Sequence, residues 1–280
     1  MGKDNKNIAL GAGAVLLSVV GFWWLKNKIP LKPKVPVVDD NTVLLLQYTY
    51  SPYCMKVAKY LDYKGIPYRA VNLLPAIQKG FVSEFSGQKK VPVVKYKGKI
   101  INDSTMIIKY FEEIFPEPTL TYKDEPELHH EIMLLEDWAD EAFLPPIRDL
   151  SLIYLYEHPE VLTETDTYKT GLGFMDKNID KIGPMIIKKM LDNYGVNINQ
   201  KDLLKKRVRA NLDLLSTKLE NKEFLLGNKL TLADLAVATH LDGAKVIAYI
   251  YEDDLYSHIF EWQEKVFKAL KRRFTAVSVK

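Results

Sequence analysis

The chain has 280 residues, a formal net charge of +3 and one cysteine, Cys54. A chain of this length suggests one or two domains and can bury an apolar core. The charge is too weak to imply a nucleic-acid partner, and a single cysteine excludes an intramolecular disulfide, which fits a reducing compartment.

The N-terminal part carries the pattern of a membrane anchor. Residues 8–25 contain no charged side chain, and at ~1.5 Å per residue they are long enough for a short membrane-spanning helix. Trp23 and Trp24 lie at the end of this segment and lysines follow it, so the positive-inside rule places the large domain in the cytoplasm. A cleaved signal peptide is the alternative, but the bulky end lacks a small-residue cleavage site. We therefore expect a tail at 1–7, a transmembrane anchor at 8–25, a tether rich in proline and lysine at 26–41, and a single-pass membrane protein.

The next part predicts strands and helices in the order β-α-β-α-β-β-α. Val43 to Gln47 is an apolar, β-prone run and predicts a buried strand. Ser51 as N-cap and Pro52 at the first helical position then begin a helix that ends at Gly65. The later elements are a strand over 68–71, a weak helix over 76–85, a hairpin of 91–96 and 99–101, and a helix from 103 or 104 to 115.

After Phe115 the pattern becomes wholly helical. Pro116 and Pro118 end the preceding helix and lie in a linker, which we place at 116–123. Thr231 and Asp234 form a capping box, to which we assign a purely structural role. The predicted helices cover 127–143, 168–194, 200–219, 231–250 and 256–271, with a break or kink at Gly183-Pro184.

Four short motifs together resemble the glutathione transferase superfamily. They are Ser51-Pro52-Tyr53-Cys54, Lys90-Val91-Pro92, Asp103-Ser104 and residues 227–234. The resemblance covers roughly 42–270 and implies a thioredoxin-like α/β domain at 42–115, an all-α domain at 124–272 and a tail at 273–280. The long segment 158–200 is similar to the membrane-associated prostaglandin E synthase type 2 branch, which is a weaker likeness.

The resemblance implies a glutathione site with Ser51 as its catalytic residue. Ser51 stands where the family carries its catalytic serine, cysteine or tyrosine. Its hydroxyl could donate to the glutathione sulfur and favour the thiolate of a thiol whose reference pKa is ~8.5. Helix capping is the alternative role of Ser51 and is compatible with catalysis, and Tyr50 is the alternative hydroxyl. The residues expected to bind glutathione are Tyr53, Lys90, Val91, Pro92, Asp103 and Ser104.

Most of these residues have an expected partner on glutathione. Val91 would offer its backbone to the cysteinyl part beside a cis Pro92. Asp103 would bind the γ-glutamyl ammonium and Ser104 the neighbouring carboxylate at a helix N-terminus. Lys90 is the candidate for the glycyl carboxylate. Each of these residues also has a structural alternative. Pro92 could be an ordinary proline at the start of a strand, Asp103-Ser104 a plain N-cap, and Lys90 a solvated lysine.

Cys54 does not support a redox reaction. In a glutaredoxin-like turn the first cysteine attacks, and here that position is Ser51, so dithiol exchange is excluded. We expect Cys54 to be a small buried side chain. The five histidines have no ligand-like spacing, and there is no P-loop or dinucleotide fingerprint, so we expect no metal and find no support for haem.

The sequence therefore predicts a membrane-anchored glutathione transferase whose catalytic domain faces the cytoplasm. Glutathione is the expected co-substrate, and a small apolar electrophile or peroxide is the expected partner. The resemblance also implies a homodimer, because members of this superfamily commonly form dimers. Two alternatives stay open: a prostaglandin-synthase-like isomerase or thiol reductase, from whose Cys-Pro-Phe-Cys turn Ser51 departs, and a non-catalytic membrane interaction module of the metaxin kind. The electrophile pocket is expected between the domains, in the region of Trp138, Phe143, Tyr154 and Tyr156.

Overall fold

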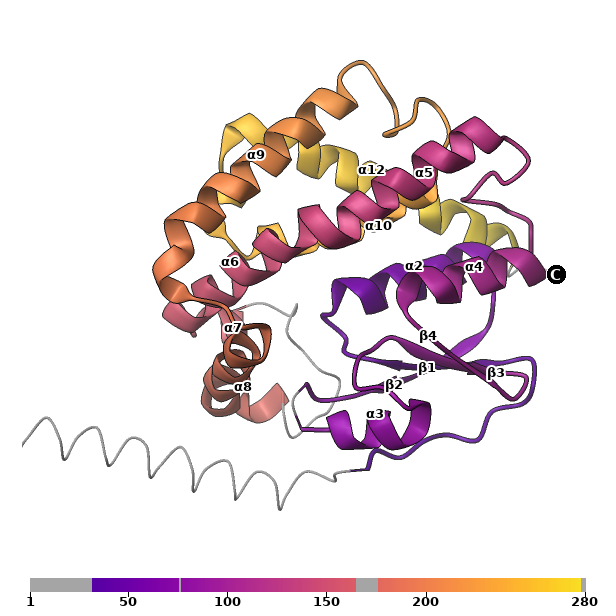
Figure 1. The fold of residues 1–280 in the computed structure, drawn as a ribbon, viewed down its shortest axis with the longest axis horizontal. Coiled ribbons are helices and arrows are strands. Elements are labelled where there is room, and N and C mark those ends of the chain that lie inside the picture. The colour runs from indigo at the N-terminus through magenta and orange to yellow at the C-terminus, as the bar shows by residue number, and fades with distance from the viewer. Residues whose placement is uncertain (1–31, 76, 165–175, 278–280) are drawn as a thin grey trace, which may run out of the picture.

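The computed structural model describes residues 32–75, 77–164 and 176–277. Its N-terminal half is a thioredoxin-like domain built on one four-stranded mixed sheet, and its C-terminal half is helical (Figure 1). The strand order is β2-β1-β3-β4; β1 pairs with β2 in parallel and with β3 antiparallel, and β3 pairs with β4 antiparallel. The strands are β1 Val43–Gln47, β2 Tyr68–Asn72, β3 Val93–Tyr96 and β4 Lys99–Asn102.

Helices cover both faces of this sheet. α2 (Pro52–Lys64) and α4 (Ser104–Ile114) lie on one face and α3 (Lys79–Ser86) on the other (Figure 1). α2 begins after the N-cap Ser51, as its sequence predicts, and ends at Gly65, whose φ of 67° is a left-handed conformation that glycine adopts at little cost.

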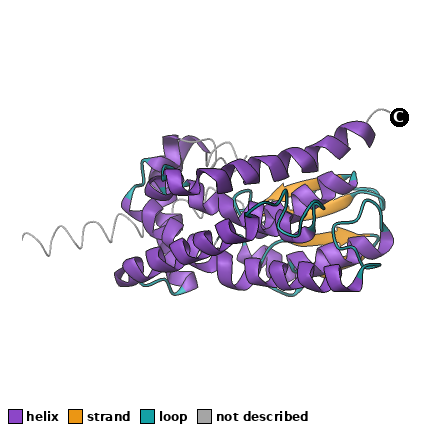
Figure 2. Cartoon of the chain, turned by 90° about the horizontal axis from the view of Figure 1, so that it is seen from above, coloured by secondary structure: helices purple, strands orange, loops and turns teal. Residues whose placement is uncertain are grey.

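The helical domain packs around α10, which runs through its middle. Figure 2 shows this domain's helices beside the strands of the sheet. Thr231 and Asp234 form the predicted capping box at the start of α10. The longer helices are α5 Pro126–Trp138, α6 Leu144–Glu157, α8 Ile179–Tyr194, α9 Lys201–Leu219, α10 Leu232–Lys245 and α12 Ser257–Val277, with the short α7 Val161–Glu164 and α11 Ala248–Tyr251 between them.

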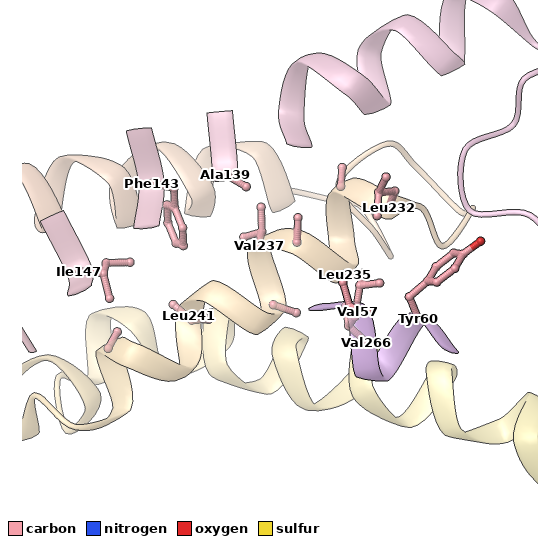
Figure 3. Packing of buried hydrophobic residues seen from close by; sticks show 14 of the residues in the cluster. Val57, Tyr60, Ala139, Phe143, Ile147, Leu232, Leu235, Val237, Leu241 and Val266 are labelled. Carbon is pink, nitrogen blue, oxygen red and sulfur yellow. The ribbon is translucent and has the colours of Figure 1, made fainter. Parts of the chain in front are cut away.

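One hydrophobic cluster crosses from the thioredoxin-like domain into the helical domain. Val57 and Tyr60 on α2 belong to the same fully buried cluster as Leu235 on α10 and Val266 on α12 (Figure 3). Burial of one such side chain contributes about 1.5–3 kcal/mol. α2 is therefore fixed by the sheet beneath it and by the helical domain above it.

The helix predicted to end at Phe143 continues instead through a π-helical turn, η1 (Ala139–Phe143), into α6. Pro145 and Pro146 have no N–H to donate, and the N–H of Leu144 bonds to the carbonyl of Ala139, five residues back. The carbonyl of Asp140 is left without a partner in the helix. The sequence did not predict this turn, because adjacent prolines usually mark the start or the end of a helix.

The helix that contains Gly183-Pro184 is continuous, so the predicted break does not occur. Pro184 lies inside α8, which loses only the hydrogen bond that a residue with an N–H would make to the carbonyl of Asp180. Ile182, Ile186 and Ile187 are buried on either side of the proline and hold the helix in place. The predicted helical residues 168–175 lie outside the described part of the chain.

The predicted membrane location is corrected by the structure. Within residues 32–75, 77–164 and 176–277, no helix has both the length and the apolar character needed to cross a bilayer. The predicted anchor at 8–25 and the tail at 1–7 lie outside these residues. The prediction of a single-pass membrane protein is therefore wrong for the structure described and is not retained.

Candidate active site

One edge of the sheet collects most of the residues predicted to bind glutathione. Leu46 near the end of β1 pairs with Val93 at the start of β3, and Val93 pairs with Asn102 at the end of β4. Ser51 follows β1, the segment 90–92 precedes β3, and Asp103 and Ser104 follow β4. The register of the strands therefore brings these three segments to the same edge.

Ser51 caps α2 and also faces an open space. Its Oγ accepts a hydrogen bond from the N–H of Cys54 at 3.5 Å, which is long for such a bond. Because the oxygen is the acceptor in that contact, the hydroxyl hydrogen remains a donor. Ser51 lines a cavity of about 470 Å³, at the positive end of the α2 dipole.

Cys54 lies one turn farther along α2 and is fully buried. Burial raises the pKa of its thiol to about 12, although the Ser51 hydroxyl acts in the opposite direction. A thiol in such a site is neutral at pH 7 and a poor nucleophile. The prediction of a small buried side chain is confirmed.

The segment that precedes β3 has the geometry expected from the sequence. The Val91–Pro92 peptide bond is cis. Val91 is half-buried, whereas Lys90 is exposed and has its backbone N–H and C=O bonded to the side chain of Gln88 at 3.2 and 2.8 Å. Lys90 therefore holds its ammonium at the surface of this edge.

Asp103 begins α4 as an N-cap. Its Oδ1 accepts from the N–H groups of Thr105 at 3.0 Å and Met106 at 3.1 Å, and its φ is 72°. The carboxylate is exposed and has lone pairs left for a further donor. Ser104 is buried at the first position of the helix. Asp103 therefore caps the helix, which is the structural alternative given for it above. Its carboxylate could still bind a cation.

Tyr53 is directed away from this edge, toward the helical domain. Its hydroxyl donates to the carbonyl of Asp140 at 3.1 Å, which is the carbonyl left free by the π-helical turn. Its ring lies edge-on to His240 with centroids 5.3 Å apart. Burial, with Asp140 adding to it, raises the pKa of the Tyr53 hydroxyl, so it remains a neutral donor. Tyr53 joins α2 to the helical domain.

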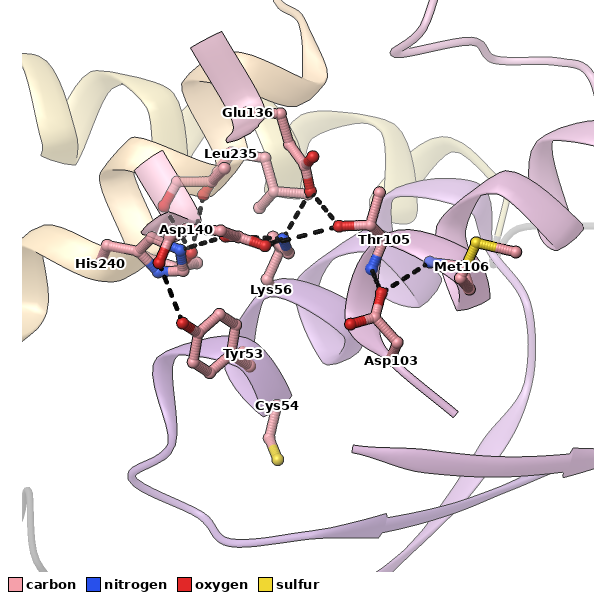
Figure 4. A network of polar contacts seen from close by, with 12 residues as sticks. Tyr53, Cys54, Lys56, Asp103, Thr105, Met106, Glu136, Asp140, Leu235 and His240 are labelled. Atoms are coloured by element: carbon pink, nitrogen blue, oxygen red, sulfur yellow. Dashed lines mark hydrogen bonds and ion pairs between the residues drawn. The ribbon is translucent and has the colours of Figure 1, made fainter. Parts of the chain in front are cut away.

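A buried ionic cluster lies beside Tyr53 and was not predicted (Figure 4). Lys56 on α2 is fully buried, and its Nζ lies 2.7 Å from Glu136 Oε1 and 2.7 Å from Asp140 Oδ2. Asp140 Oδ1 also lies 2.6 Å from His240 Nε2, and Thr105 Oγ1 donates to Glu136 Oε1 at 2.5 Å. The cluster therefore connects α2 and α4 with α5, η1 and α10.

The pKa shifts of Asp140 and His240 indicate the charges of these two side chains. Burial would raise the pKa of Asp140, but the hydrogen bond from His240 and the charge of Lys56 outweigh it and hold that pKa below its ordinary value. Burial lowers the pKa of His240 despite the contact with Asp140. A neutral His240 thus donates Nε2–H to an ionised Asp140. One feature of the sequence could have predicted the burial of Lys56. It lies four residues before Tyr60 and therefore on the same, buried face of α2.

A cavity of about 470 Å³ opens between the start of α2 and helices α6, α8 and α10. Trp138, Phe143, Tyr154 and Tyr156, predicted for this region, do not line it, and Phe143 belongs to the core. The lining surface is mostly apolar, with four tyrosines and Arg148 beside aliphatic side chains that include Leu152, Leu155, Leu162, Ile186, Ile187 and Met190. Ser51 and Tyr53 are the residues of the predicted glutathione site that reach it.

The chain is similar to curated proteins of two kinds. Prostaglandin E synthase 2 of Danio rerio is 27% identical over 275 residues, covering 82% of this chain and 71% of that protein. Glutathione S-transferase U4 of Arabidopsis thaliana is 29% identical over 174 residues, covering 57% of this chain and 78% of that protein.

Solved structures share the fold at lower identity. The beta-etherase LigF of Sphingobium sp. strain SYK-6 has a TM-score of 0.63 and 17% identity, with 82% of this chain and 99% of that chain covered. A glutathione S-transferase of Rhodospirillum rubrum F11 has a TM-score of 0.55 and 21% identity, with 82% and 87% covered.

Two models of one family match the two halves of the chain. Residues 45–119 match the glutathione S-transferase N-terminal domain, and residues 180–269 match the glutathione S-transferase C-terminal domain. Together with the mixed sheet and the helical domain that follows it, these matches show that the chain belongs to the glutathione S-transferase superfamily.

Proposed function

We propose that this protein is a glutathione transferase that delivers the glutathione thiolate to an apolar electrophile or peroxide. One observation carries the proposal: Ser51, at the N-terminus of α2, lines a mostly apolar cavity of about 470 Å³. Val91 and Asp103 stand at the same edge of the sheet as Ser51. A peptide bound along that edge would present its thiol at the mouth of the cavity.

Ser51 would activate the thiol by stabilising its charged form. Free glutathione is mostly protonated at pH 7, because a thiol has a pKa of ~8.5. Donation of the Ser51 hydroxyl hydrogen to the sulfur and the positive end of α2 both favour the thiolate. Ser51 keeps its own proton through the reaction, so it acts electrostatically and forms no bond to the substrate.

The remaining segments of the edge would hold glutathione in place. The backbone of Val91 would pair with the cysteinyl residue, beside the cis Pro92. Asp103 would bind the γ-glutamyl ammonium, Ser104 the carboxylate at the start of α4, and Lys90 the glycyl carboxylate. To Tyr53 we now assign a positioning role, because its hydroxyl is bonded to Asp140.

Two further predictions from the sequence belong to this proposal. We place the glutathione-binding domain at 42–115 and the all-α domain at 124–272. A homodimer is expected because glutathione transferases commonly form dimers, and large apolar side chains are exposed on β4, α4 and α5 at Ile100, Met106 and Leu134.

A second candidate function is that of a prostaglandin-synthase-like isomerase. The likeness to Prostaglandin E synthase 2 of Danio rerio, which covers 82% of this chain, favours it. A thiol-based version of that chemistry would need a reactive cysteine. The one cysteine of the chain, Cys54, is buried with a raised pKa, so we rank this candidate second.

Calorimetric titration of the full chain with glutathione tests the binding site. We expect a dissociation constant between micromolar and millimolar for the native sequence. Asp103→Asn should weaken it about tenfold, because the charged partner of the ammonium is lost while an asparagine still caps α4. Asp253→Asn is the matched control, since Asp253 is also an N-cap acid but lies in the helical domain. Absence of binding by the folded chain, or equal affinity in the Asp103 variant, would count against the site.

A further inference from the structure

We infer that the electrophile of this enzyme is an elongated, unbranched apolar molecule that lies along α2 with its reactive carbon beside Ser51. The inference rests on the proposed transferase function and adds the shape and the chemistry of the second substrate. It is carried by the residues that line the cavity.

The cavity follows one face of α2 over three helical turns. The lining residues Ser51, Met55, Ala58 and Asp62 are separated by three or four positions, so they stand above one another on the helix. At 1.5 Å per residue, the path from Ser51 to Asp62 is about 16 Å long. A space of this length and of about 470 Å³ is elongated rather than round.

A face of α8 also contributes to the lining, with the same spacing. Ile179, Gly183, Ile186, Met190 and Tyr194 all line the cavity. A Cβ on Gly183 would lie 2.5 Å from Cδ1 of Leu162, which also lines the cavity. The missing side chain therefore lets α8 approach Leu162.

The chemistry of the lining changes along the cavity. Aliphatic side chains of α6 and α8 line it together with Arg148, whereas Lys59, Asp62 and Asp242 give the region toward the end of α2 a charged lining. The Lys59 ammonium lies 3.9 Å from the Phe267 ring centroid, and Asp242 accepts from Gln263 at 2.7 Å. An apolar chain that starts at Ser51 and follows α2 thus passes Met55 and Ala58 before it reaches the charged Lys59, about 12 Å from Ser51 at the rise of an α-helix.

A compact electrophile would use this space poorly. It could contact the residues near Ser51, but the rest of the apolar wall would have no partner atoms, and those dispersion contacts would be lost. An unbranched chain contacts the α2 face along its length. Each methylene that it buries should raise kcat/KM about threefold, until the chain reaches the charged region.

A homologous series of unbranched enals, from crotonaldehyde to a decenal, tests the inference with glutathione as co-substrate. The thiolate forms a carbon–sulfur bond at the β-carbon, the π pair of the carbon–carbon double bond shifts to the bond between the α-carbon and the carbonyl carbon, and the carbonyl π pair moves to the oxygen. The enolate then takes a proton from water at the α-carbon as the carbonyl re-forms. We expect kcat/KM of the native chain to rise with each added methylene over several members of the series.

Ala58→Leu places a larger side chain midway between Ser51 and Asp62. It should reduce the ratio of kcat/KM for the longest enal to that for the shortest by more than about tenfold, because the far half of the cavity becomes inaccessible. Ala210→Leu is the matched control: Ala210 is exposed on α9 and does not line the cavity, so the ratio should stay as in the native chain.

A rate independent of chain length, or a ratio unchanged in Ala58→Leu, would overturn the inference and leave the transferase function standing. If no enal reacts although the chain binds glutathione, this inference fails, whereas absence of glutathione binding by the folded chain would count against the proposed function itself. The calorimetric titration separates the two cases.

Discussion

Replacing Ser51 with alanine should lower kcat for glutathione conjugation by about 10²–10³-fold. The hydroxyl is the donor that lies at the mouth of the cavity and can stabilise the thiolate. Glutathione affinity should change little, because the binding contacts are assigned to Val91, Asp103 and Ser104. Steady-state kinetics with a saturating electrophile, together with calorimetric binding, would show the split between kcat and affinity.

The same substitution also removes the N-cap of α2. The loss of a serine cap costs about 1 kcal/mol of stability, which is too little to unfold a typical domain. Ser51→Thr is the control that keeps both the hydroxyl and the cap, and it should retain most of the activity. If Ser51→Ala turned over at the native rate, the hydroxyl would have no part in catalysis.

Replacing Lys56 with methionine should lower the free energy of unfolding by about 3–5 kcal/mol. Lys56 is fully buried between Glu136 and Asp140, at 2.7 Å from each carboxylate. Methionine leaves two buried carboxylates with less compensation, and a buried charge that loses its partner is costly. Denaturant unfolding followed by circular dichroism would measure the loss.

Lys265→Met is the matched control for Lys56→Met. Lys265 pairs with Glu223 at 3.4 Å, but the two side chains are 52% and 47% exposed, so the loss should stay below about 1 kcal/mol. Adding Glu136→Gln and Asp140→Asn to Lys56→Met should recover part of the stability, because the unpaired charges are then removed as well. A Lys56→Met variant as stable as Lys265→Met would show that the buried cluster does not join the two domains.

The parts of the fold that depend on neighbouring residues could be predicted from the sequence. Ser51, Pro52 and Gly65 define α2 because capping is local chemistry, and the capping box of Thr231 and Asp234 defines α10 for the same reason. The turn η1 escaped prediction because adjacent prolines usually mark the start or the end of a helix. The partner of its free Asp140 carbonyl, the Tyr53 hydroxyl, lies far away in the sequence and leaves no local pattern.

In the candidate site, too, residues in short motifs could be predicted, whereas residues whose role depends on distant neighbours could not. Ser51, Val91 and Asp103 were found through short motifs, and the strand register then placed them at one edge. The cavity wall could not be found, because an aliphatic residue such as Ile186 looks the same in a sequence whether it packs in a core or lines a cavity. The partners of Lys56 could not be found either, since pairing across two domains leaves no local pattern.

The pKa of the thiol of bound glutathione tests the central claim most directly. It can be measured from the ultraviolet absorbance of the thiolate as the pH of a mixture of the full chain and glutathione is varied, with Ser51→Ala as the reference. We expect an apparent pKa at least about one unit below the free value of ~8.5 for the native chain, and a smaller shift for the variant. An unshifted thiol pKa in glutathione that is demonstrably bound would contradict the account.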